Sequence, residues 1–270
     1  MSRFAKSPLR YPGGKSRAIE QILKHFPTQI TEFREPFVGG GSVFLAVKSL
    51  YGQLIKRYWI NDLYEDLILF WTHLRDQPEE LEATLRSLKL NIPEGRALYN
   101  LLKQPESSTH EFDRAVRFFI MNRITFSGVM DAGGYSQLAF EGRFTDSSID
   151  RLERTSYYLQ GVEITQGDYE PLICAEGSGV FIFLDPPYWS ATDSKLYGAK
   201  GVLHTGFDHE RFAEVMKRCP HQWLMTYDDS PKIRDLFGFA NLYEWELQYG
   251  MNNYKSDTAA KGKELFLCNF

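Results

Sequence analysis

Four consecutive residues, Asp185, Pro186, Pro187 and Tyr188, combine groups that could hold the amino group of a flat base. Asp185 offers an acceptor side chain, and Tyr188 offers a planar ring. The two prolines have no N–H, so they stiffen the turn and leave carbonyls without a competing donor. An amine bound by these acceptors, with its base stacked on the tyrosine, is what methylation of an adenine amino group needs.

The tetrad 185–188 follows an apolar run, residues 180–184, which predicts a buried strand. In open α/β sheets, ligands bind beyond the carboxyl ends of the strands. The tetrad is therefore expected at the edge of the sheet where a substrate would bind.

A glycine-rich loop, EPFVGGG at residues 35–41, lies between an expected strand and an expected helix. Gly39 and Gly41 would let a ligand approach the backbone, and the start of the helix presents free N–H groups. Phe44 replaces the third glycine of the dinucleotide fingerprint, so the loop alone fits an ordinary tight turn equally well. Asp62 ends the next expected strand, about 20 residues further on, where an acid can bind ribose hydroxyls. Loop and acid together predict an adenosine-containing ligand.

The segment YPGGK, residues 11–15, lacks the first glycine of the Walker A pattern because Leu9 stands there. Tyr11 could pack against a ligand and Lys15 could meet a carboxylate. Taken alone, the segment is better interpreted as an N-terminal turn with a solvated lysine.

Asp168 and Tyr169 follow the end of another expected strand. Asp168 could accept a hydrogen bond from an adenine amine, with Tyr169 packed nearby. Capping of a helix is the commoner use of aspartate, so both interpretations stay open.

Strands alternate with helices in two stretches of the chain, on either side of a helical middle region. The expected strands cover residues 31–34, 54–60, 162–165, 180–184, 223–227 and 265–270, and the expected helices cover 42–50, 208–218 and 230–237. This alternation predicts an α/β fold with a mainly parallel, doubly wound sheet. In the middle region, residues 127–144 are rich in Gly and polar residues, and Gly133-Gly134 signals a hairpin turn. We expect residues 66–154 to be an inserted subdomain of helices and a hairpin, and residues 1–65 and 155–270 to be the main domain.

The composition limits the partners of the protein. A formal net charge of −4 and a pI near 5.9 argue against bulk-charge binding of polyanions but allow local basic patches. No apolar run approaches membrane-spanning length, and neither the three cysteines nor the six histidines show metal-ligand spacing. We expect a cytoplasmic protein, monomeric or weakly dimeric, without a membrane partner or a bound metal.

The order of these segments resembles the Dam-type (D12) adenine-specific DNA methyltransferases, over nearly the whole chain. The resemblance implies a Rossmann-like methyltransferase sheet with an inserted DNA-recognition subdomain, S-adenosylmethionine as methyl donor, and double-stranded DNA as partner, hence a location at the nucleoid. The tetrad would then hold an adenine flipped out of the duplex. A sulfonium methyl is electrophilic, so the enzyme needs alignment of the amine with it rather than a metal or a covalent nucleophile. The implied cofactor site consists of Tyr11, Lys15, Phe37, Gly39, Gly41, Asp62, Asp168 and Tyr169.

By the same resemblance, the inserted region would contact DNA through Asn122, Arg123, Ser127, Asp131 and Tyr135. Relatives that read GATC tend to carry a basic residue where this chain has Asp131, and arginine is the usual reader of guanine edges. We therefore expect a recognition sequence other than GATC. Further candidate phosphate contacts, or merely parts of a solvated helix face, are Arg114, Arg117 and Arg143.

Three other functions stay open at this point. Methyltransferases that act on RNA or on a protein amide typically carry Asn-Pro-Pro-Tyr and lack the inserted region, so Asp185 argues against them. A catalytically inactive DNA-binding regulator would not need the intact tetrad, Asp62 and glycine loop. A nicotinamide dehydrogenase is disfavoured by the incomplete glycine fingerprint.

Overall fold

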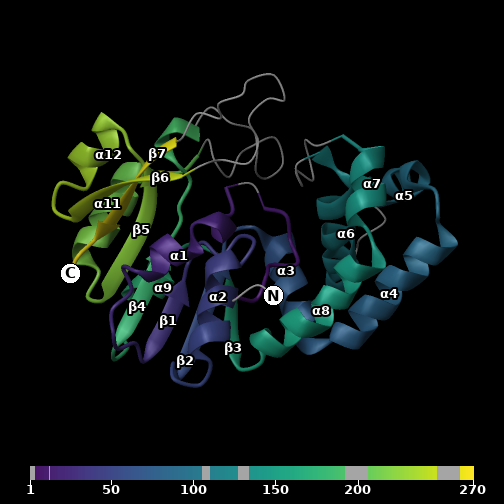
Figure 1. Cartoon of the computed structure of the whole chain (residues 1–270), viewed down its shortest axis with the longest axis horizontal. Coiled ribbons are helices and arrows are strands. Elements are labelled where there is room, and N and C mark those ends of the chain that lie inside the picture. Colours follow the sequence, from purple (N-terminus) through teal and green to yellow (C-terminus); the bar gives the residue numbers. More distant parts are fainter. Residues whose placement is uncertain (1–3, 12, 105–109, 127–133, 192–205, 248–261) are drawn as a thin grey trace.

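A seven-stranded sheet forms the centre of the protein, in the order β3-β2-β1-β4-β5-β7-β6 (Figure 1). The computed structural model describes residues 4–11, 13–104, 110–126, 134–191, 206–247 and 262–270. The strands are β1 (Glu32–Glu35), β2 (Arg57–Asp62), β3 (Val162–Gln166), β4 (Val180–Leu184), β5 (Gln222–Asp228), β6 (Asn241–Leu247) and β7 (Gly262–Cys268). Pairing is parallel from β3 to β5, whereas β7 is antiparallel to β5 and β6. The predicted mainly parallel α/β sheet is confirmed, and β6 is an additional strand that was not predicted.

Helices cover both faces of this sheet. Along β4, Phe181 and Phe183 join one apolar cluster, and Ile182 and Leu184 join the other. A strand with a core on each side must be apolar throughout, which explains its unbroken run. The sequence order of the strands reverses between β1 and β4, and such a switch point is where doubly wound sheets bind ligands.

The neighbouring strand β1 is charged and yet buried. Arg34 is fully buried, pairs with Glu32 at 2.6 Å, and donates to the carbonyls of Leu172 and Ala175. Because these partners satisfy the guanidinium, a charged side chain is tolerated in the interior.

The helices are η1 (Lys15–Arg17), α1 (Ile19–Leu23), α2 (Ser42–Tyr51), α3 (Glu65–Asp76), α4 (Pro78–Asn91), α5 (Gly95–Leu102), α6 (Glu111–Ile124), α7 (Gln137–Arg143), α8 (Asp146–Leu159), α9 (Glu170–Cys174), η4 (Trp189–Ala191), α11 (His209–Arg218) and α12 (Pro231–Leu236). Helices α3 to α8 follow β2 and precede β3, and α4 to α7 extend away from the sheet (Figure 1). The predicted boundary between residues 154 and 155 falls inside α8. Across the described ranges, each helix is too short or too polar to span a bilayer.

The predicted hairpin over residues 127–144 needs a correction. Thr125 and Tyr135 form an antiparallel bridge, so the chain does turn back on itself. Residues 137–143, however, form helix α7, which begins where the Ser136 hydroxyl accepts a hydrogen bond from the amide of Ala139. Such a serine cap favours a helix over a returning strand.

Candidate active site

A pocket of about 800 Å³ opens at the carboxyl ends of the central strands. Every residue predicted for the cofactor and for the base lines it. These are Tyr11, Lys15, Phe37, Gly39, Gly41, Asp62, Asp168, Tyr169, Asp185, Pro186, Pro187 and Tyr188. The structure therefore brings together residues that lie up to 177 positions apart, between Tyr11 and Tyr188.

The glycine loop closes tightly on its neighbours. Gly39 and Gly41 have φ values of +46° and +66°, which favour glycine. A Cβ atom at Gly39 would lie 2.9 Å from the Tyr11 ring, and one at Gly41 would lie 3.0 Å from Trp71. Larger residues at Gly39 or Gly41 would therefore distort the backbone of the loop that leads into α2.

Asp62 supports this loop from the end of β2. Its carboxylate accepts hydrogen bonds from the amides of Gly39, at 2.9 Å, and Tyr64, at 3.0 Å. Burial nevertheless raises the pKa of Asp62 to about 6, against the lowering effect of these amides. The carboxyl group is therefore held in the pocket wall and ionises as the pH rises through about 6.

Lys15 pairs with Asp185 at the centre of the pocket. The Lys15 ammonium lies 2.8 Å from Oδ1 and 3.0 Å from Oδ2 of Asp185, and 4.8 Å from the centre of the Tyr188 ring. Thr226 donates a hydrogen bond to Asp185 Oδ1 at 2.7 Å. Lys15 is buried rather than solvated, so the interpretation as an exposed turn lysine is wrong.

Four acids that line the pocket were not predicted as site residues: Glu35, Asp208, Asp228 and Glu264. Glu35 ends β1, and its Oε2 atom is buried without a hydrogen-bond partner in the described ranges. Burial, followed by the charges of Asp185 and Asp62, raises the pKa of Glu35 well above its usual value. Glu35 and Asp228 each end a strand, and that position was the signal that could have identified them.

An aromatic wall closes one side of the pocket. The ring of Phe37 lies 5.4 Å from that of Tyr169 and 5.8 Å from that of Phe207. Next to this wall, Asp168 pairs with Arg211 at 2.8 Å and accepts a hydrogen bond from the amide of Glu170. Asp168 therefore fixes the turn before α9 and also lines the pocket, and its hydrogen bond to an adenine amine stays a prediction.

The residues predicted to contact DNA fall into different environments. Asn122 is buried, and its amide group exchanges two hydrogen bonds with the backbone of Arg10, so it secures the N-terminal segment. Tyr135 is buried as well, and its hydroxyl donates a hydrogen bond to Gln137. Ser127 and Asp131 lie outside the described residues.

The arginines divide into paired and unpaired groups. Arg114 pairs with Glu65 and Asp66 of α3, and Arg117 approaches Asp66 at 3.6 Å, so both link helices. Arg123 Nε and Arg143 Nη1 are buried and have no hydrogen-bond partner within the described part of the chain.

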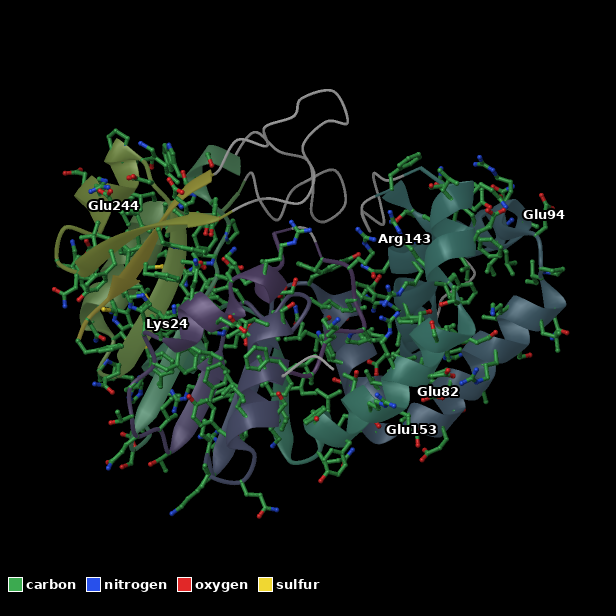
Figure 2. The ribbon with its side chains drawn as sticks, in the orientation of Figure 1. Lys24, Glu82, Glu94, Arg143, Glu153 and Glu244 are labelled. Carbon is green, nitrogen blue, oxygen red and sulfur yellow. The ribbon has the colours of Figure 1, made fainter. Side chains whose placement is uncertain are left out.

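Arg123 lies in a cluster of positive charge. Burial and then the charges of Arg151, Arg10 and Arg143 lower the pKa of Arg123 to about 9. None of these four arginines forms a salt bridge in the ranges that the structure describes. Figure 2 shows Arg143 on the side of the helices that faces the sheet, away from Glu82, Glu94 and Glu153.

Comparison with known proteins places the chain in a family. The family described as "D12 class N6 adenine-specific DNA methyltransferase" matches residues 11–251. The type II methyltransferase M1.LlaDCHI of Lactococcus lactis subsp. cremoris is 24% identical, over 97% of this chain and 94% of that protein. The DNA adenine methylase of Vibrio cholerae is 28% identical, over 87% of this chain and 85% of that protein. The DNA N-6-adenine-methyltransferase of Escherichia phage P1 is 29% identical, over 87% of this chain and 31% of that protein.

The sheet, with β7 antiparallel at the β5 side, is that of a Rossmann-like methyltransferase. Within that class, the chain belongs to the D12 N6 adenine-specific DNA methyltransferases. It is an adenine N6-methyltransferase of the Dam or type II restriction–modification kind. The predictions of family, fold class and reaction are confirmed, and the readings as an RNA or amide methyltransferase and as a dehydrogenase are set aside.

Proposed function

We propose that this enzyme binds S-adenosylmethionine and an adenine rotated out of double-stranded DNA in the one pocket at the switch point of its sheet. The observation that carries the proposal is the convergence of the glycine loop, Asp62 and the tetrad 185–188 on that pocket. A base inside a duplex is inaccessible to a buried site, so it must leave the helix to react.

The residues present fit such a cofactor. S-adenosylmethionine supplies an electrophilic methyl group and carries positive charge, which would favour ionisation of the buried Glu35, whose Oε2 atom has no hydrogen-bond partner among the described residues. Asp62 is suited to bind ribose hydroxyls, and the wall of Phe37 and Tyr169 is suited to pack against an adenine ring. Lys15 is suited to bind the carboxylate of the methionine part.

The tetrad is suited to hold the target base. Asp185 and the Pro186 carbonyl would accept hydrogen bonds from the adenine amine and direct its lone pair, while Tyr188 stacks on the ring. These residues orient the amine, and orientation alone can supply a large part of a rate enhancement.

DNA would reach the pocket along the inserted region, residues 66–154, which we propose as the target-recognition subdomain. The arginines Arg10, Arg123, Arg143 and Arg151 support this proposal, because a buried guanidinium, that of Arg123, lies among three further positive charges without a salt bridge to an acid in the described residues, and an anion would stabilise such a cluster. Backbone phosphates supply such anions and position a protein on DNA without reading its sequence.

Transfer of label from S-adenosylmethionine to duplex DNA, followed by digestion to nucleosides, tests the function. We expect label in N6-methyladenosine, and no transfer with Asp185→Ala although cofactor binding persists. Cofactor binding without transfer to any DNA by the unaltered protein would contradict the proposal.

A further inference from the structure

The buried acid Glu264 lies in the pocket without a part in the chemistry proposed above. It is on β7, is 1% exposed, and its carboxylate accepts a hydrogen bond from the Tyr188 hydroxyl at 2.9 Å. A buried carboxylate is costly unless its interactions compensate. Its contact with Tyr188, the aromatic residue of the tetrad, suggests that the acid orients this ring.

Three side chains of the β5–β7 pair each hold a different part of the tetrad segment. Thr226 binds the Asp185 side chain at 2.7 Å. Asp228 accepts hydrogen bonds from the amides of Trp189 and Ser190, at 2.8 and 3.2 Å, and so fixes the backbone after the tetrad. Glu264, which lies opposite Asp228 in the antiparallel register, accepts the hydrogen bond of the Tyr188 hydroxyl, and Thr226 also contacts this hydroxyl.

The ring of Tyr188 is thereby fixed at its outer end. The ring of Tyr227 lies 5.7 Å away and only 22° from parallel, which restricts it further. Because the Tyr188 ring is ordered before the base arrives, binding of the base does not include the entropic cost of ordering this side chain. We propose that Glu264 is a positioning residue, which holds the Tyr188 ring in the orientation needed for the flipped adenine to stack on it; this inference rests on the proposed function.

The charges around Glu264 make this contact sensitive to pH. Lys15, Asp185, Tyr188 and Asp228 face it from the neighbouring elements, and burial together with the two acids raises the pKa of Glu264 to about 7, against the opposing effect of Lys15. An ionised carboxylate accepts a stronger hydrogen bond than a protonated one. Base stacking should therefore improve as the pH rises through neutrality.

The test compares Glu264→Gln, Tyr188→Phe and the double variant, with Glu244→Gln as control. Glu244 is an exposed acid on the adjacent strand β6 (Figure 2). It pairs with Arg234. Capture of the base is followed by the fluorescence of 2-aminopurine at the mapped methylation site, with an unreactive cofactor analogue, and turnover is measured in parallel.

Glu264→Gln and Tyr188→Phe should each lower base capture and kcat/KM about tenfold, and the double variant should lose little more than either. Both single variants should flatten the pH dependence of base capture near 7. Their cofactor affinity should stay within about twofold of that of the unaltered protein. The control Glu244→Gln should match the unaltered protein in each measurement. If the two losses of kcat/KM multiply in the double variant, or if Glu264→Gln keeps the pH profile of the unaltered protein, the role of Glu264 is overturned and the proposed function still stands. A wild type that transfers no methyl group would overturn the proposed function and this inference with it.

Discussion

The Lys15 ammonium contacts both oxygens of the Asp185 carboxylate, at 2.8 and 3.0 Å, and lies 4.8 Å from the centre of the Tyr188 ring. Asp185 is proposed to accept a hydrogen bond from the adenine amine, and Tyr188 is proposed to stack on the adenine ring. Lys15 therefore stands where a ligand amine would stand, and it must give up part of this contact when the base enters. A cofactor carboxylate would be a suitable new partner for it.

Replacement of Lys15 tests this exchange. Lys15→Met should lower methyl transfer at least about tenfold and weaken cofactor binding, because the methionine keeps the length of the side chain but loses its charge. Turnover and calorimetric titration of the cofactor measure the two effects. Lys24→Met removes an exposed lysine near α1 and should leave both unchanged (Figure 2).

Alanine substitutions should have opposite effects on stability at Gly41, in the glycine loop, and at Gly142, outside it. Gly41→Ala should destabilise the protein by about 1–3 kcal/mol, since φ is +66° and the new methyl group would lie 3.0 Å from Trp71. Gly142→Ala, in helix α7, should stabilise by about 0.5–1 kcal/mol, because the added Cβ meets nothing within 4 Å. Urea unfolding measures both, and equal effects would contradict the strain assigned to the loop.

The unpaired arginines predict a change in the salt dependence of DNA binding. Arg143→Gln should weaken binding to any duplex and reduce the slope of log K against log salt by about 1. Arg114→Gln removes an arginine that already pairs with Glu65 and Asp66, so it should leave the slope unchanged. Titrations at several salt concentrations separate the two, and identical slopes would place the phosphates elsewhere.

The raised pKa of Asp62 predicts a pH dependence of cofactor binding. As the pH rises through about 6, the carboxyl ionises and becomes a better acceptor for ribose hydroxyls, so affinity should increase. Asp62→Asn should bind more weakly and show a smaller change between pH 5 and about 7. Calorimetry across this range measures it.

The same shift acts on stability with the opposite sign. The folded protein binds the Asp62 proton more tightly than the unfolded chain, whose pKa is near 3.8. This contribution is complete below about pH 4 and is lost as the pH rises through about 6, so unliganded Asp62→Asn should lose less stability over that window. A steeper loss in the variant would contradict the assignment.

The recognition sequence is expected to differ from GATC because Asp131 stands where GATC readers tend to carry a basic residue. Long-read sequencing of DNA from a host that expresses the protein identifies the methylated site. Clean methylation at GATC would show this expectation to be wrong.

The sequence predicted the residues of the pocket that stand next to glycines, prolines or apolar runs, such as Gly39 and Asp185, because strand ends have a recognisable local pattern. It did not predict Glu264, which reaches the pocket only through the antiparallel insertion of β7 beside β5. The family resemblance favoured Arg123 over Arg114 as a DNA contact, but the sequence did not show that Arg114 pairs with Glu65 and Asp66, because this pairing depends on which acids pack nearby. Strand β6, rich in polar residues, was missed because it lies at the edge of the sheet, where one-sided burial leaves a weak signal.

The placement of α4 to α7 bears on how such enzymes diverge. These helices interrupt a single crossover, between α3 and α8, that joins the adjacent strands β2 and β3. Residues gained, lost or exchanged there change no strand neighbour and no register. With the recognition role proposed for the inserted region, changes there could alter the DNA sequence that is read over evolutionary time, while the sheet keeps one unchanged reaction.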